Sequence, residues 1–499
     1  MSGKLKKGLL LVLAAVLLVG SSQLQRSLNR ERDALGLTRV EALENAPPVL
    51  AFTTVALGGF RGIISNLLWI RANDLQDDDK FFEMAQLADW ITKLEPNFVQ
   101  VWLMQAWNMA YNISVKFKDY PDRWRWVKRG VELLRDDGLR YNPNEVLIYR
   151  ELGWFFQHKM GQNLDDASMY YKQQWANEMA AVFDKKKPNL DELIHPQTAD
   201  QTNRARLLRE KYKMDPEFMK KVDEQFGPLE WRLPESSAVY WAAKGLKAAK
   251  ENPTKVNPDD FITLRRVIYQ SMQLSFKRGR LIADPFSKTF DFGPNLDIIP
   301  KVSAAYEQEA NEDPKMHDHI LSAHRNFLRD AVFYLYEHNR MRDATTWFNY
   351  LCKQYHDKRL LDGNPDSMPG TLTVDDYVFG RVKEMVGETM GRDEAQAAIE
   401  GYLASSYQSL ALDEDDRSAG QRAIARQIWN AYTAQLPKER LDALALRPFA
   451  DIDTEIRNRL LDPQHGLPVE VRAVLRSKLS LPAETKEVKQ ASAESVPAK

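Results

Sequence analysis

Cysteine is almost absent from this chain of 499 residues, in which Cys352 is the only one. A single cysteine excludes a disulfide framework within the chain and any metal site built from several thiolates. Net charge is nearly absent as well, because 69 basic side chains balance 70 acidic ones and leave −1 at pH 7. The sequence also has no dense basic patch and no base-stacking motif, so we expect no nucleic-acid partner.

Long apolar runs are scarce, and the clearest one lies near the N-terminus. Three lysines precede an uninterrupted apolar run from Leu9 to Val19, which is the arrangement of a signal segment. The run is short for a hydrocarbon core of about 30 Å, so a cleaved signal peptide competes with an uncleaved anchor. We favour an anchor in which residues 8–22 hold the chain in the inner (cytoplasmic) membrane as a single pass. The bulk of the chain is then extracytoplasmic, and it is periplasmic if the segment is cleaved.

A second apolar stretch, Val49–Ile70, carries Arg61 near its middle. An arginine at the centre of a bilayer costs about 2.5–3.5 kcal/mol on insertion scales. We therefore expect a buried first helix in this stretch, with a second membrane-associated segment as the alternative.

The rest of the chain is patterned for helices, since apolar residues recur at helical spacing from about residue 60 onward and no run alternates like a strand. One segment is highly charged and punctuated by proline, and the C-terminal tail has too few large apolar side chains to offset its ordering entropy. The six parts that we predict are residues 1–22 (signal anchor or signal peptide), 23–48 (juxtamembrane stalk), 49–182 (N-terminal helical domain), 183–235 (charged linker or insertion), 236–480 (C-terminal helical-repeat domain) and 481–499 (disordered tail).

One phrase of the sequence occurs twice, 47 positions apart. In the first copy Leu94–Asn97 introduces Val101–Trp107, and in the second Tyr141–Asn144 introduces Tyr149–Phe156. The alignment places Pro96 on Pro143, Trp102 on Tyr149, Ala106 on Gly153 and Trp107 on Trp154. Spaced self-similarity of this kind indicates repeat architecture.

The second copy resembles the first helix of a tetratricopeptide repeat, whose signature is aromatic-x-x-Leu-Gly-x-x-aromatic. The resemblance implies that small Gly153 lets the paired helix approach closely and that Pro143 ends the helix before it. A helix pair around the Asn339–Asp343 turn is similar. The packing positions implied by the resemblance are Trp102, Ala106, Pro143, Tyr149, Leu152, Gly153, Phe156, Ala344 and Phe348.

The fold class that we predict is all-α. Degenerate tetratricopeptide-like helical hairpins form an α-solenoid, preceded by one N-terminal transmembrane helix. Arrays of this family present a concave surface to a peptide or partner helix. Among the tryptophans, Trp90, Trp102 and Trp107 have core spacing, whereas Trp124 and Trp126 alternate with arginines and are the better candidates for a partner surface.

The sequence carries no convincing reaction signature, so we expect no enzyme, no cofactor and no metal. Glu235-Ser236 resembles the pair that holds the catalytic glutamate of superhelical lytic transglycosylases. However, Pro234 indicates a helix start, where the helix dipole lowers a carboxyl pKa, and a general acid needs the opposite. The histidines around His317 and His324 lack a convergent third ligand for zinc.

We therefore expect a membrane-tethered extracytoplasmic helical-repeat scaffold or adaptor that mediates protein–protein interaction in a bacterial cell envelope. The alternatives are an all-α carbohydrate-active enzyme of transglycosylase type and a structural subunit of an envelope or transport complex. Neither partner identity nor oligomeric state follows from the residues.

Overall fold

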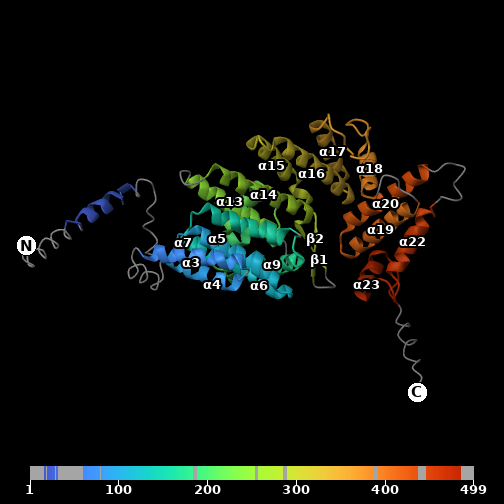
Figure 1. The fold of residues 1–499 in the computed structure, drawn as a ribbon. Helices are drawn as coiled ribbons and strands as arrows, with labels where there is room; N and C mark the ends of the chain where they lie inside the picture. Colours follow the sequence, from blue (N-terminus) through green and yellow to red (C-terminus); the bar gives the residue numbers. More distant parts are fainter. Residues whose placement is uncertain are drawn as a thin grey trace, which may run out of the picture. The chain divides into compact units, whose positions relative to one another are not determined.

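A computed structural model gives the fold, and the residues that it describes are 16–17, 19–28, 30–31, 60–78, 80–162, 164–183, 188–252, 257–284, 289–386, 392–435 and 446–484. Nearly all regular structure in these ranges is helical (Figure 1), which confirms the all-α prediction. Contacts divide the chain into two compact units, residues 1–148 and 149–499. Among the helices of the described ranges, none combines the length and the apolar character needed to cross a bilayer.

The first unit is built from two helical hairpins. Helix α3 pairs with α4, and a kinked helix made of α5, η2 and η3 pairs with one made of α6, η4 and α7. The bounds are α3 (Phe60–Asp77), α4 (Phe81–Leu94), α5 (Val99–Trp107), π-helix η2 (Asn108–Ile113), 3₁₀-helix η3 (Ser114–Lys116), α6 (Tyr120–Glu132), π-helix η4 (Leu133–Gly138) and α7 (Leu139–Tyr141). Apolar side chains between the hairpins form the core, among them Ala72, Leu75, Met84, Ile91, Val101 and Ile113.

The two copies of the sequence phrase also have similar secondary structure. Helix α5 passes into η2 at Asn108, and 47 residues later α8 (Val146–Trp154) passes into the π-helix η5 (Phe155–Gly161) at Phe155. Rings four residues apart stack across both junctions, Trp107 on Tyr111 with centroids 5.0 Å apart and Trp154 on His158 at 4.4 Å. The two segments therefore have the same local structure, while kinship to tetratricopeptide repeats stays a prediction.

The turns that introduce the two copies match as well. The amide of Phe98 donates to the Glu95 carbonyl at 2.9 Å, and the amide of Glu145 donates to the Asn142 carbonyl at 3.1 Å. Proline follows the first residue of each turn and disfavours helical backbone at the residue before it. Helix α7 accordingly ends before Pro143, as predicted.

The second unit continues with consecutive helices that pack as neighbours, α13 on α14, α16 on α17 and α19 on α20. Its elements after η5 are α9 (Ser168–Phe183), α10 (Leu190–Ile194), α11 (Ala199–Glu210), α12 (Pro216–Phe226), α13 (Pro234–Glu251), α14 (Pro258–Arg278), β1 (Arg280–Asp284), β2 (Thr289–Gly293), η7 (Leu296–Ile298), α15 (Ile299–Glu312), α16 (His317–Glu337), α17 (Met341–Gln354), α18 (Val374–Val386), α19 (Arg392–Ala411), α20 (Asp415–Gln435), α22 (Phe449–Leu460) and α23 (Val469–Lys478).

The predicted linker 183–235 is a packed part of the second unit over its described residues. Helices α10, α11 and α12 lie there, and Leu193, Leu208 and Met219 are completely buried. The charges that suggested a linker occupy the outer faces of these short amphipathic helices, for example in the exposed Lys220–Asp191 ion pair. Residues 149–182 group with the later helices rather than with the N-terminal domain in which we had placed them.

Two smaller differences from the prediction concern strands and the tail. Although we found no run that alternates like a strand, residues 280–284 and 289–293 form an antiparallel pair, in which β1 pairs with β2 from Arg280 opposite Gly293 to Asp284 opposite Thr289. The tail has contacts as far as Glu484, which accepts a hydrogen bond from Arg472 at 2.7 Å. Residues 485–499 lie outside the described part, as do most of the predicted stalk and residues 8–15 of the predicted anchor.

Candidate functional site

The residues of the Tyr149–Phe156 phrase lie in α8 and η5 and pack mainly on α13 and α14. Gly153 faces both helices, because a Cβ at this position would meet Val267 Cγ1 at 3.0 Å and Ala242 Cβ at 3.5 Å. Tyr149 stacks on Trp241 of α13 with ring centroids 6.3 Å apart. The close approach that we expected at Gly153 is present, but the helices that make it are α13 and α14 rather than the next helix of the predicted hairpin.

The next helix, α9, packs on η5 instead. The ring of Phe156 meets that of Trp175 edge-on at 4.8 Å, and Leu152 and Tyr171 are completely buried. The hairpin of α8–η5 and α9 therefore exists with a six-residue connection, and its contact is one turn beyond Gly153.

The first copy of the phrase has its own anchoring contacts. Trp102 is 3% exposed, stacks on Tyr141 at 6.0 Å and donates from Nε1 to the Pro96 carbonyl at 2.8 Å. The buried Asn142 side chain donates to the same carbonyl at 2.8 Å. Ala106 is completely buried. These contacts fix the turn at Pro96 against the end of α7.

The second predicted helix pair is present as α16 and α17. Ala344 is completely buried and Phe348 lies 5.4 Å from the ring of Tyr377 in α18. The turn between the two helices uses Asn339 with a positive φ of 56°, a conformation that asparagine tolerates better than most residues.

The tryptophans are distributed differently from the prediction. Trp90 and Trp107 are 48% and 42% exposed, so our expectation that they are core residues is wrong. Trp126 is partly buried, with its ring 5.7 Å from Phe82, and Trp124 is partly buried as well. The spacing of the tryptophans in the sequence did not predict their exposure, because α4 and α5 each bury only one face.

Exposed apolar side chains gather in the described part of the first unit. On α3 the side chains of Ile63, Leu67 and Ile70 are 58%, 62% and 58% exposed. They occupy positions i, i+4 and i+7, which share one face of a helix; we call these three residues the outer stripe. The opposite face of α3 packs on α4 and α5 through Leu68 and Leu75. The expected buried first helix is therefore buried on one side only.

Buried ionisable groups gather in the second unit near the start of α13. Helix α13 begins at Pro234, as predicted, but Glu235 is 1% exposed and its Oε2 has no hydrogen-bond partner. Burial raises the pKa of Glu235, opposed by the positive charge of Lys172. Our expectation that the helix dipole lowers this pKa is wrong, because desolvation outweighs it.

Lys172 of α9 is the partner that the sequence did not reveal. It is completely buried, and burial lowers its pKa to about 8, while the charge of Glu235 acts in the opposite direction. Nearby, the buried Lys159 donates to Asp165 at 2.6 Å. Burial alone would raise the pKa of Asp165, but the hydrogen bonds from Lys159 and the Ala167 amide lower it to about 2.

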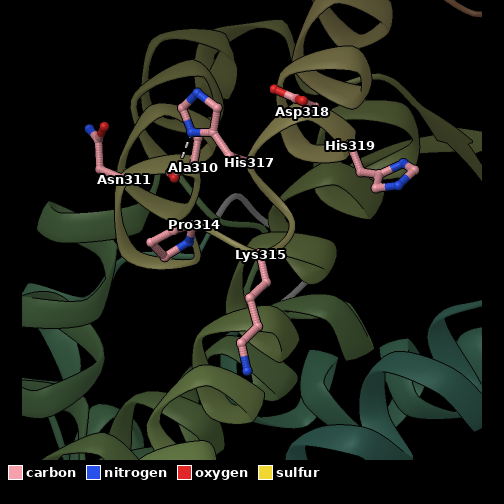
Figure 2. A pocket seen from close by; sticks show the side chains of 7 residues that line it. All are labelled: Ala310, Asn311, Pro314, Lys315, His317, Asp318 and His319. Carbon is pink, nitrogen blue, oxygen red and sulfur yellow. Dashed lines mark hydrogen bonds between the residues drawn. The ribbon is translucent and has the colours of Figure 1, made fainter.

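The histidines that invited a metal site lie apart. A hollow of about 460 Å³ lies at the turn between α15 and α16, and Figure 2 shows His317 and His319 on different sides of it. His317 donates from Nδ1 to the Ala310 carbonyl at 2.9 Å. His324 is buried between Ser303 and Tyr355, each 2.9 Å from a ring nitrogen. Within the described ranges no group of three or more His, Cys, Asp or Glu side chains is placed to hold a metal ion.

A second ionic cluster, built around the buried Arg329, joins α16 to α18 and the segment between them. Arg329 is 4% exposed in its side chain and donates to Asp362 at 2.9 Å and to Glu384 at 3.1 Å. Arg381 donates to the same Glu384 at 2.8 Å and to Asp330 at 3.0 Å. Asp362 is 70% exposed in its side chain, but together with Glu384 it balances the charge of the buried Arg329, so the cluster holds these segments together.

The fold thus defines a class, an all-α protein of packed helices. No protein-family model, curated protein or solved structure matches the chain.

Proposed function

We propose that this chain is a membrane-tethered, extracytoplasmic scaffold or adaptor of a bacterial cell envelope, built as a degenerate tetratricopeptide-like solenoid. Residues 8–22 would be its anchor and the helical hairpins its binding scaffold. The charged and apolar order of the N-terminal sequence supports the tether. The repeated α5–η2 and α8–η5 segments support the solenoid, because repeated hairpins stack side by side.

The observation that carries the binding function is the exposure of three large aromatic side chains in the described part of the first unit. Trp90 and Trp107 each leave more than two-fifths of their surface in water, and Phe82 is 51% exposed. Tryptophan is enriched at the energetic centres of protein interfaces, since it buries a large area with few rotamers. A protein partner that covers these rings would exploit that property.

Site-specific photo-crosslinking in intact cells tests the proposal. A benzophenone amino acid at position 107 or 90 should yield discrete protein adducts. The matched control positions are Leu164 and Met169, which are 66% and 47% exposed in the second unit. Adducts at the control positions that equal those at 107 and 90 would contradict a partner surface on the first unit.

Purification of the protein from the same cells distinguishes an adaptor from a structural subunit. After solubilisation in detergent, a stoichiometric complex that survives purification indicates a subunit, whereas a partner that exchanges with added competitor indicates an adaptor. Sequencing the N-terminus of the mature chain decides between anchor and cleaved signal peptide.

An all-α carbohydrate-active enzyme of transglycosylase type is the second candidate, and Glu235 is the observation that favours it. A general acid needs a raised pKa, and burial moves the pKa of Glu235 in that direction. Its 1% exposure argues against this role, because a glycosidic oxygen reaches the carboxyl only if the start of α13 opens. Peptidoglycan turnover that disappears in Glu235→Gln while the protein stays folded would establish the enzyme and contradict the scaffold.

A further inference from the structure

The outer stripe gives α3 a second apolar face, opposite the one that packs on the core of the first unit. Leu68 and Leu75 face the core of the first unit, whereas Ile63, Leu67 and Ile70 are each more than half exposed. A helix that is apolar on opposite faces is ordinarily buried on both. We therefore expect that the stripe is covered by something other than water.

We infer that the occupant is a lipid surface, on which α3 lies in the plane of the bilayer. The inference rests on the proposed tether, which keeps the first unit next to lipid. Because its inner face packs on α4, α3 can offer lipid only its outer face, as an interfacial helix does. Arg61, which argues against a span, is compatible with a helix at headgroup depth.

The distribution of charge along the sequence agrees with a lipid surface. From Asn45 to Ile70 the only charged residue is Arg61, and residues 62–70, which include the stripe, carry no charge. Charge begins immediately after it, with the exposed pair Arg71 and Asp74. The uncharged part of α3 is thus the part that carries the stripe.

The size of the stripe argues against a second copy of this chain. Seven residues separate Ile63 from Ile70, about 10 Å along a helix. Three side chains over this length expose far less than the ~800 Å² per partner that a stable dimer buries. A membrane contact needs no such area, because a tether supplies a high effective concentration of lipid.

Fluorescence quenching of the full chain in vesicles tests the inference. The vesicles contain phosphatidylcholine and phosphatidylglycerol in a 2:1 ratio, with a nitroxide on a fraction of the acyl chains. Cys352→Ser removes the only cysteine, and an environment-sensitive dye is placed on Leu67→Cys or on the control Gln76→Cys. Gln76 is exposed on the same helix beyond the stripe. Acyl nitroxide should quench the dye at position 67 at least threefold more than the dye at position 76.

A second variant separates the stripe from the fold. Ile63→Asn with Ile70→Asn should reduce nitroxide quenching at position 67 to the level of position 76. Both side chains are mostly exposed, so the thermal unfolding midpoint should stay unchanged. A variant that keeps full quenching at position 67 would overturn a role for the stripe.

Alkaline carbonate extraction of the same vesicles reports on the tether independently. If the chain resists extraction but iodide in water quenches both dyes equally, the tether stands and the lipid contact is wrong. If position 67 is shielded from iodide and nitroxide alike, a protein surface covers the stripe and the inference is again wrong. If carbonate removes the chain although position 67 is quenched by nitroxide at neutral pH, the lipid contact stands and the tether fails.

Discussion

The backbone of Gly245 in α13 lies against the side chain of Tyr149 in α8, so closely that a Cβ on this glycine would come within 2.9 Å of the Tyr149 Cβ. One turn further along α8, Gly153 stands against Val267 at a comparable distance, 3.0 Å. Two glycines on facing helices thus set the separation of α8, α13 and α14, and every prediction about this interface depends on them.

Enlarging either glycine should separate these helices. Gly153→Leu and Gly245→Leu should each lower the free energy of unfolding by about 1–3 kcal/mol, because overpacking forces backbone shifts. Urea denaturation followed by circular dichroism measures the change. The matched control is Gly401→Leu in α19, where no side chain lies within 4 Å and loss of a helix glycine should stabilise by about 0.5–1 kcal/mol. Equal midpoints for Gly153→Leu and the control would contradict the packing.

The Trp102 indole and the Asn142 side-chain amide both donate to the Pro96 carbonyl, and each should be able to satisfy it when the other is removed. Trp102→Phe removes the indole donor but leaves the amide of Asn142, and Asn142→Ala does the reverse. Either change alone should cost about 1–2 kcal/mol, and the double variant more than the sum, because a buried carbonyl is then left without a partner. A double-mutant cycle of unfolding free energies measures the excess. A strictly additive cycle would show that the two donors do not share this acceptor.

Acid should destabilise the second unit through two buried histidines. Burial lowers the pKa of both His324 and His338 to about 4, below the ordinary value near 6.5. A depressed pKa means that the folded state resists the proton, so stability is complete above about pH 6.5 and declines as pH falls towards 4. The loss of unfolding free energy is on the order of 3 kcal/mol per histidine once the pH is below both the folded and the unfolded pKa.

Unfolding free energies between pH 7 and pH 4 measure this loss. His324→Gln should flatten the dependence relative to the parent protein. An unchanged pH dependence in His324→Gln would exclude this histidine as a source.

Arg329 should not be replaceable by lysine. Its guanidinium reaches Asp362 and Glu384 at once, and an ammonium lacks the planar fork that allows this. Arg329→Lys should lower the free energy of unfolding by about 2–4 kcal/mol, since the buried cation then keeps only one of its two carboxylate partners. Arg459→Lys is the control, because Arg459 is 56% exposed and pairs with Glu400 at 3.6 Å, and it should change stability by less than 1 kcal/mol. Chemical denaturation compares the two, and similar losses would indicate that Arg329 is not clamped.

Several features of the fold could be predicted because they are local. The helix stop before Pro143 depends on the backbone of adjacent residues, and the 47-residue repeat appears directly in the order of side chains. The turn at Asn339 is a local signal as well. The helix end before Pro143 and the turn at Asn339 are present in the structure, because their physical cause lies within a few residues along the chain.

Contacts between distant segments could not be predicted in this way. Nothing near Lys172 in the sequence indicates that its charge acts on Glu235, more than sixty residues later. The exposure of Trp90 and Trp107 depends on which face of α4 and α5 is covered. The charged stretch 183–235 has the composition of a linker, and only the neighbours of α10, α11 and α12 show that it is packed.

The sequence by itself determined the all-α class, the repeated phrase and the places where helices stop, since helical periodicity and proline act within one or two turns. Only the tertiary structure decided which helices Gly153 separates, how burial shifts the pKa of Glu235, and that α3 carries an uncovered apolar stripe. The physical reason is that desolvation and close packing depend on every atom around a group, and those atoms come from parts of the chain that local patterns do not connect.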